Sequence, residues 1–291
     1  MDHQNERADQ ALKNSRNGKA GGKIIAIIGG VIALIGIVAS MIPVVIVGVV
    51  IAGLGGMLKD KTKDAARVQL NDTVVRQALD EVFENAEFNP SVHLSYEDVE
   101  GSGIPLPTHT DVGGGEYVKA AHRGMQVELS SIVLSSRAEF EDENTGMREW
   151  RETVDYQGQW MLCRMGAEMP SGLIVWPRGK LDKIFRTGTI KTGVDDFDRR
   201  FNLSADDGEA VLRYLNPARM ERFLALADSA GGGLSVALNR DGTLRVGVQS
   251  GHGFFDFGKG RESADSLKER FVRELRWFID MLDALRPACA A

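Results

Sequence analysis

Residues 234–248 read LSVALNRDGTLRVGV, a stretch that predicts two antiparallel strands joined by a tight turn. Residues 240–242, Arg-Asp-Gly, supply the turn, because aspartate and glycine tolerate the backbone angles that short hairpin loops require. Large apolar side chains take every second position on both arms: Leu234, Val236, Leu238, Leu244, Val246 and Val248. Because strand side chains alternate between the two faces of a sheet, we expect one face of this hairpin to be buried.

A pair of short helices is predicted immediately before the hairpin. Asp206 and Glu209 have the spacing of a capping box, although the first residue is aspartate rather than serine or threonine. Asn216-Pro217 provides a second N-cap, followed by proline at the first helical position, where its missing N–H costs nothing. Three glycines at 231–233 end the second helix before the hairpin begins.

Residues 92–203 alternate short β-like runs with turn residues. No pattern of helical length separates these runs, which argues against a parallel sheet and favours antiparallel pairing. The expected strands are Val92–Tyr96, Glu116–Ala121, Met125–Ser135, Thr153–Met165, Leu173–Trp176 and Phe197–Leu203.

Two longer helices are predicted by apolar residues at steps of three and four. One covers residues 61–88 and stops at Asn89-Pro90. The other is an amphipathic C-terminal helix over residues 262–285. Its apolar stripe has two interpretations, packing in the core of this domain or a coiled-coil contact with another chain.

Residues 24–58 contain no charged side chain. At about 1.5 Å per residue, one helix of this length would be longer than the ~30 Å hydrocarbon core of a bilayer. Pro43 offers a break, since proline removes a helix donor and restricts the residue before it. We therefore predict a transmembrane helical hairpin with spans 24–39 and 44–58. One long or kinked span and a cleaved signal peptide are the alternatives.

Basic flanks orient this membrane segment. Five Lys or Arg residues oppose three acidic residues before the apolar run, and four oppose two in residues 59–67. The positive-inside rule then places both termini and the soluble domain in the cytoplasm, at the inner membrane. Gly48, Ala52 and Gly56 form a small-residue stripe, which suits packing between protomers or packing of the two spans against each other.

Composition excludes several classes of partner and cofactor. The whole chain has a formal net charge of −6 although both flanks are positive, so the domain that follows is acidic. An acidic domain repels phosphate backbones, and nucleic acid is not an expected partner. Cys163 and Cys289 stand far apart without a CxxC pattern, so neither a disulfide framework nor a zinc site is indicated. We expect no cofactor and no metal.

These patterns predict an α+β fold in four segments. An N-terminal transmembrane helical hairpin is followed by a soluble domain with a mainly antiparallel sheet, a helical pair and a long C-terminal amphipathic helix. The expected segments are a polar tail (1–22), the membrane hairpin (23–58), a connecting helix (59–90) and the soluble domain (91–291).

Residues 194–222, VDDFDRRFNLSADDGEAVLRYLNPARMER, resemble the bacterial family of unknown function DUF3137. The family pattern is a Phe-x-x-x-Phe strand, an acidic turn, and a leucine-rich helix ending in Thr-Pro before a second helix. Asn216 stands here in place of the threonine, and both residues cap helices. A looser match lies at residues 156–161, YQGQWM, and the resemblance covers most of residues 24–257. It implies a two-span membrane protein and carries over no catalytic residue.

No motif in the sequence identifies a reaction. The acidic residues between 195 and 209 favour helix capping and a solvated turn over a divalent-ion site, because no EF-hand spacing is present. Residues 113–115, three glycines, favour a flexible strand connection over a phosphate-binding loop, since no Lys-Ser/Thr follows them. The candidate binding residues are His93, His122, Asp198, Asp206 and His252.

We therefore expect a non-catalytic binding or scaffolding module at the bacterial inner membrane. Its partners would be the bilayer and either a protein or a second copy, bound through the membrane helices or the C-terminal helix. An enzyme acting on a membrane-proximal substrate is one alternative, because catalytic groups can converge from distant positions. A lipid-binding domain, with a cavity between the sheet and the C-terminal helix, is another.

Overall fold

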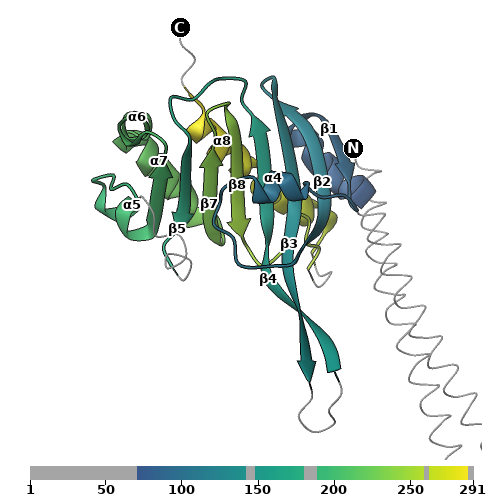
Figure 1. Ribbon diagram of the computed structural model, residues 1–291. Coiled ribbons are helices and arrows are strands. Elements are labelled where there is room, and N and C mark those ends of the chain that lie inside the picture. The colour runs from purple at the N-terminus through teal and green to yellow at the C-terminus, as the bar shows by residue number, and fades with distance from the viewer. Residues whose placement is uncertain (1–70, 142–147, 180–188, 259–261, 288–291) are drawn as a thin grey trace, which may run out of the picture. The chain divides into compact units, whose positions relative to one another are not determined.

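The computed structural model describes residues 71–141, 148–179, 189–258 and 262–287 (Figure 1). The predicted tail and membrane hairpin, with Gly48, Ala52 and Gly56, lie outside these residues. Within the described ranges, no helix combines the length and the apolar character needed to cross a bilayer. The chain divides into two compact units, one of residues 1–81 and 257–272, the other of residues 82–256 and 273–291.

The first unit is helical in its described part. Its elements are η1 (Asn71–Val75), most of α3 (Arg76–Val82) and the beginning of α8 (Ala264–Leu285). Val75, Ala78 and Leu79 are fully or almost fully buried, in agreement with the predicted apolar spacing. An ion pair between Lys268 Nζ and Glu81 Oε2, 2.8 Å apart, joins α8 to the end of α3.

The helix predicted for residues 61–88 is shorter at its C-terminal end than expected. It stops at Val82, and Glu84–Asn89 forms strand β1. Asn85, within β1, has a φ of 53°, which lies outside the right-handed helical region, so the helix cannot continue through this position. Ala86 and Phe88 are then half-buried at alternate positions, the period of a strand rather than a helix.

The second unit contains one eight-stranded sheet in the order β1-β2-β3-β4-β8-β7-β5-β6, and every pair is antiparallel. The predicted antiparallel sheet is therefore confirmed. The strands after β1 are β2 (Asp111–His122), β3 (Met125–Glu141), β4 (Arg148–Arg164), β5 (Leu173–Pro177), β6 (Phe201–Ala205), β7 (Gly233–Leu238) and β8 (Thr243–Gln249). β3 and β4 pair from Gln126↔Arg164 to Glu141↔Arg148, and their outer ends extend beyond the neighbouring strands (Figure 1).

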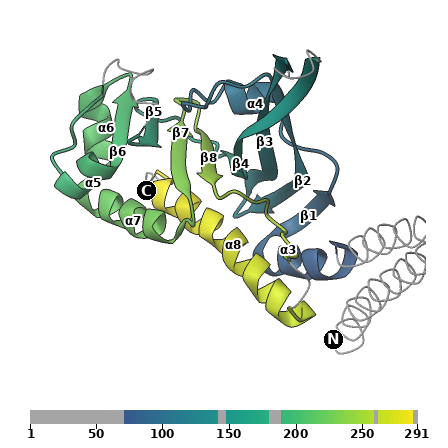
Figure 2. The same cartoon turned by 90° about the horizontal axis from the view of Figure 1, so that it is seen from below.

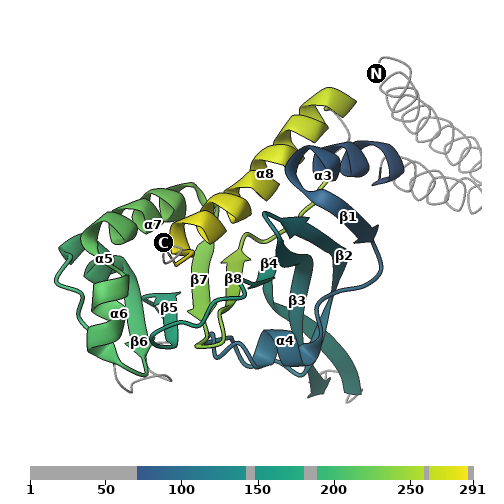
Figure 3. The same ribbon diagram turned by 90° about the horizontal axis from the view of Figure 1, so that it is seen from above.

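Helices and a long connection cover both faces of this sheet. Figures 2 and 3 show α7 (Pro217–Ser229) and the C-terminal part of α8 on one face, and α4 (Tyr96–Glu100) on the other. The remaining helices, α5 (Asp195–Arg200) and α6 (Gly208–Tyr214), lie by the β6 edge. Aromatic contacts fix that edge, since the rings of Phe197, Phe201 and Phe223 have centroids 5.2–5.6 Å apart.

The hairpin of residues 234–248 is confirmed as β7 and β8, with Val236 opposite Val246. Gly242 closes the turn with a φ of 78°, and a Cβ there would stand 2.2 Å from the carbonyl oxygen of Ala167. The apolar face is buried as predicted. The opposite face is also covered in part, because Ala237 is fully buried within a cluster that includes Leu94 and Val99.

Two predicted strands are partly helical. Val92–Tyr96 is not a strand, and α4 begins at Tyr96 because the Ser95 side chain accepts a hydrogen bond from Asp98 N at 3.1 Å. Phe197–Leu203 begins within α5 and becomes strand only at Phe201. Phe197 and Phe201 are four residues apart, the spacing of one helical face, which an alternating pattern cannot explain.

The glycines at 113–115 lie within β2 rather than in a connection between strands. The register of β2 against β3 shifts between Gly115 and Val118, so the strand carries a β-bulge there. Gly114 has a φ of 148°, and a Cβ would stand 1.9 Å from Ser131 O. Gly114 therefore serves a close approach of β2 and β3, whereas Gly113 makes only an ordinary contact.

Helices α7 and α8 agree with the sequence patterns. Asn216 caps α7, with its Oδ1 accepting from Arg219 N at 3.1 Å. The C-terminal helix is present as α8, and it buries Leu275, Phe278 and Leu282 in the second unit. Cys163 is fully buried in β4, where burial raises the pKa of its thiol to about 12.

Candidate functional site

The five candidate residues from the sequence do not come together in the structure. No hydrogen bond or ion pair among the described residues joins any two of them. His93 Nδ1 lies 2.7 Å from the carbonyl oxygen of Leu94, and His252 Nδ1 lies 2.8 Å from that of Gly253. Such contacts with the adjacent residue orient an imidazole locally and do not assemble a site.

His122 stands beside the carboxylate of Asp283. Its Nε2 lies 4.0 Å from Asp283 Oδ1, and Arg123 Nη1 lies 3.1 Å from Asp283 Oδ2. Burial lowers the pKa of His122 from its ordinary value of 6.5, while the charge of Asp283 opposes this shift. The described contacts of His122 and Arg123 therefore connect β2 and the residue after it to α8 through Asp283. These contacts include no nucleophilic side chain.

Asp198 holds the loop that precedes α5. Its two carboxylate oxygens accept the backbone N–H groups of Thr192 (3.0 Å) and Gly193 (3.3 Å) and the Thr192 hydroxyl (3.1 Å). Burial alone would raise the pKa of Asp198, but these hydrogen bonds outweigh it and hold the pKa below 3.8. Asp198 is thus an ionised acceptor for its own loop.

Asp206 is exposed, and its Oδ2 accepts from Gly172 N and from Arg240 Nε, both at 3.2 Å. The capping residue of α6 is Asp207 rather than Asp206, with Ala210 N donating to Asp207 Oδ1 at 3.0 Å. No group of three or more metal-ligating side chains occurs among the residues that the structure describes.

A cavity of about 220 Å³ lies instead on the sheet face that carries α4. Its walls combine aromatic, proline and aliphatic side chains, a lining typical of sites that bind small molecules. The lining residues are Ile104, Pro105, Leu106, Pro107, Tyr156, Trp160, Trp176, Pro177, Arg178, Gly179, Gly233, Ser235, Gly247 and Gln249. We call this cavity the indole pocket, after Trp160 and Trp176.

Small residues on β8 and β7 form the floor of the indole pocket. Trp160 on β4 pairs with Gly247 on β8, which pairs in turn with Ser235 on β7. A Cβ on Gly247 would lie only 3.1–3.3 Å from three atoms of the Trp160 indole. The glycine therefore makes room for this ring, and the row of small residues leaves space between the two tryptophans.

The two indole N–H groups of the pocket are donors, and the side chains of Tyr156, Ser235 and Gln249 can donate or accept. The Nε1–H of Trp160 donates to the hydroxyl oxygen of Tyr156 at 3.0 Å. Burial raises the pKa of Tyr156 far above its ordinary value, so this hydroxyl keeps its proton. Trp176 is 4% exposed, and its Nε1–H is buried without an acceptor among the described residues. A buried donor without a partner costs about 1–3 kcal/mol. A ligand acceptor would recover this cost by displacing the atoms that shield the N–H from the cavity.

Arg178 supplies the positive charge of the indole pocket. The residue is exposed, and its Nε donates to the backbone carbonyl of Phe201 at 3.3 Å. That bond uses one of the five guanidinium N–H groups. No Asp, Glu, His, Cys or Lys is among the described residues that line the pocket. The lining therefore suits binding of a molecule with hydrogen-bond acceptors and provides no general base.

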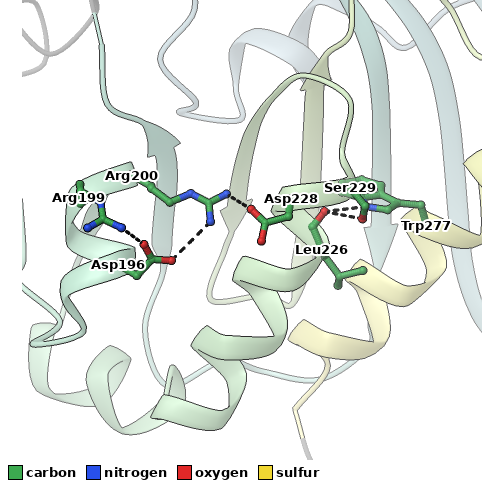
Figure 4. A network of polar contacts seen from close by, with 7 residues as sticks. All are labelled: Asp196, Arg199, Arg200, Leu226, Asp228, Ser229 and Trp277. Carbon is green, nitrogen blue, oxygen red and sulfur yellow. Dashed lines mark hydrogen bonds and ion pairs between the residues drawn. The ribbon is translucent and has the colours of Figure 1, made fainter.

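A second polar cluster on the same unit has a structural role. Figure 4 shows Arg200 between Asp196 and Asp228, at 3.6 Å and 2.7 Å, and Trp277 Nε1 donating to Leu226 O at 3.0 Å. These contacts connect α5 to α7 and α7 to α8. Exposed ion pairs of this kind contribute about 0–1 kcal/mol each. A more open cavity of about 460 Å³ adjoins Trp277, whose indole N–H already has an acceptor.

Sequence reasoning missed the indole pocket. Ser235 and Gly247 occupy alternate positions of the hairpin that a period-two pattern assigns to solvent. The sequence does contain two tryptophans, Trp160 and Trp176, and a hairpin with small residues on one face. That these features lie side by side can be recognised only when the order of the strands is known.

Comparison with known proteins gives one family and one solved structure. A family model described as protein of unknown function (DUF3137) matches residues 154–286. This range includes the C-terminal helix and begins later than the resemblance to residues 24–257 implied. No curated protein matches the chain. The crystal structure of the mycobacterial trehalose monomycolate transport factor A, TtfA, is similar over 75% of this chain and 97% of that chain, with 12% sequence identity and a TM-score of 0.36.

Proposed function

Residues 154–286 belong to the DUF3137 family of unknown function, and from this premise we propose that the protein is a membrane-anchored, non-catalytic module that binds a small ligand. The observation that carries the proposal is the indole pocket. It offers an aromatic enclosure and a buried, unpaired N–H at Trp176, with no acid–base residue in its described lining.

The size of the indole pocket limits what it can hold. A cavity of about 150 Å³ in another protein holds benzene. The 220 Å³ of the indole pocket then suit a ring or a short chain with one polar group. A whole phospholipid is too large, so the bilayer is a partner of the anchor and not of this pocket.

The anchor is supported by residues 24–58 and their basic flanks. An uncharged run of this length has a lower free energy in hydrocarbon than in water. We propose two spans, with both termini and the folded domain on the cytoplasmic side of a bacterial inner membrane. The ligand would then be a cytoplasmic or membrane-proximal molecule, and the acidic net charge of −6 disfavours nucleic acid.

Fractionation tests the anchor. The full chain should sediment with membranes, resist extraction at high pH and enter solution only with detergent. A chain that lacks residues 24–58 should stay in the supernatant. A full chain that remains in the supernatant without detergent would refute the anchored half of the proposal.

A fragment screen by ligand-observed NMR tests the binding half, with the full chain in lipid nanodiscs and neutral, anionic and cationic fragments of about ten heavy atoms. Ser235→Leu would fill the floor of the indole pocket, and Ser204→Leu is the matched control on β6 outside it. Fragments should bind the wild type and Ser204→Leu but not Ser235→Leu. Equal signals from all three proteins would refute the pocket as the binding site.

A further inference from the structure

We propose that the indole pocket binds a small apolar carboxylate, that is, an acid group on an aromatic ring or a short hydrocarbon chain. This inference rests on the proposed binding function and adds the chemical class of the ligand. It follows from the shape of the pocket, from the Trp176 donor that lacks an acceptor among the described residues, and from the positive charge of Arg178 in the lining.

The apolar part of the ligand is indicated by the walls. Trp160 and Trp176 stand on either side of the small residues Gly247 and Ser235. Pro105 is buried in the wall and lacks a backbone N–H, so this part of the lining offers a ligand hydrocarbon surface and no donor. A flat ring or a short chain fills such a space with favourable aromatic contacts.

The acceptor part of the ligand is indicated by the donors. The Trp176 N–H is buried with no acceptor among the described residues. The Tyr156 hydroxyl receives the Trp160 N–H and retains a proton that it can donate. A carboxylate accepts several hydrogen bonds at once, whereas an ammonium group accepts none.

The negative charge of the ligand is indicated by Arg178. Its guanidinium is the charged group of the described lining, and no carboxylate there balances it. Arginine matches the planar geometry of a carboxylate and repels a cation. An amine of the same shape would be repelled by Arg178. No acidic side chain in the described lining would pair with its charge.

Isothermal titration calorimetry on the full chain in lipid nanodiscs tests the inference with three probes of one shape. Phenylacetate is the carboxylate, phenylacetamide the neutral analogue and phenethylamine the cation. Phenylacetate should bind about tenfold more tightly than the amide, equivalent to about 1.4 kcal/mol, and the amine most weakly. Equal or tighter binding of the amide or the amine would overturn the carboxylate assignment.

Two substitutions separate the charge from the donor. Arg178→Gln should weaken phenylacetate about fivefold to tenfold and leave phenylacetamide unchanged. Trp176→Phe keeps a ring but removes the N–H, and it should weaken both probes by about fivefold. Trp277→Phe and Arg213→Gln are the matched controls outside the pocket, and they should change neither affinity. An Arg178→Gln protein that binds phenylacetate as tightly as the wild type would also overturn the assignment.

A free organic acid and the carboxyl end of a polypeptide share this chemistry. N-acetylphenylalanine carries the ring, the carboxylate and a peptide amide. If it binds more tightly than phenylacetate, the result supports a carboxylate ligand that is the C-terminal end of a polypeptide. If it binds more weakly than phenylacetate, the result supports a carboxylate ligand that is a free organic acid. If none of the probes binds, the carboxylate inference fails, while the proposed function is decided separately by the NMR screen with Ser235→Leu.

Discussion

Gly158→Ala should destabilise the protein, because β8 runs too close to this position of β4 for any side chain. A Cβ on Gly158 would stand 2.1 Å from the backbone oxygen of Val248 and 2.8 Å from the Tyr156 hydroxyl. Real Cβ atoms essentially never come within 3.0 Å of another heavy atom, and 2.1 Å falls 0.9 Å short of that limit. The Val248 oxygen cannot move freely, since it accepts the N–H of Ser250 at 3.0 Å.

The size of the effect follows from two opposing terms. Overpacking a filled interior costs about 1–3 kcal/mol and occasionally more, and a backbone obstacle belongs at the upper end of that range. Replacing glycine by alanine in extended backbone returns about 0.4–1 kcal/mol, because the unfolded chain loses entropy. The net expectation for Gly158→Ala is a loss of about 2 kcal/mol in the free energy of unfolding.

Gly113→Ala is the matched control, since Gly113 also lies within a strand. The nearest atom to its Cβ would be Val133 O at 3.9 Å, an ordinary contact. The entropy term then acts alone, and the control should be unchanged or more stable by up to about 1 kcal/mol. The two substitutions should therefore shift stability in different directions although their chemistry is identical.

Urea unfolding of the full chain in mild detergent, followed by tryptophan fluorescence, measures both variants. With a slope of about 2 kcal/mol per molar urea, Gly158→Ala should lower the midpoint by about 1 M. A Gly158→Ala midpoint equal to that of the wild type would refute the close approach of β4 and β8. It would also remove the support for the position of Tyr156 in the indole pocket.

Three further predictions use the same protein. Asn216→Ala removes the N-cap of α7 and should cost about 1 kcal/mol in the same urea assay; an unchanged midpoint would contradict the cap. Cys163 should not react with a thiol reagent at pH 8 in a Cys289→Ser chain until urea unfolds it, since burial raises its pKa to about 12; prompt labelling of the folded chain would refute its burial. Burial lowers the pKa of His122 although the charge of Asp283 opposes this shift. The imidazole of the unfolded chain therefore binds a proton more readily than that of the folded chain, and the free energy of unfolding should fall as the pH drops from 7.5 to 5. His122→Gln should reduce that fall, and an identical pH profile would count against it.

The elements that sequence reasoning predicted correctly are those whose signals are local. The hairpin at 234–248 combines a turn with apolar alternation on both sides, and the N-cap at Asn216 lies next to its proline. The amphipathic period of α8 likewise spans the whole helix. Each signal comes from neighbouring residues, so no knowledge of the tertiary structure is needed to interpret it.

The errors arose where two local signals compete or where the cause is not local. Residues 92–96 contain alternating apolar side chains, but Ser95 and Asp98 also form a helix cap, and the cap prevails in α4. Glu84–Asn89 contains only two half-buried side chains, which is too little for a strand pattern. Its strand conformation comes from pairing with β2 at the edge of the sheet, a non-local cause.

The indole pocket shows why a site can be absent from every local pattern. Trp160, Gly247 and Ser235 belong to β4, β8 and β7, and they become neighbours only because β8 and β7 follow β4 in the sheet. The period-two rule treats the small and polar positions of a hairpin as a solvent face. Here Gly247 is small because a large indole on the adjacent strand needs the space. A hairpin face of serine, alanine and glycine is therefore ambiguous between solvent exposure and close packing. Tryptophans on other strands of the same sheet favour close packing, because their rings need small neighbours. Where the rings and the small residues do not fill the space completely, a cavity is left.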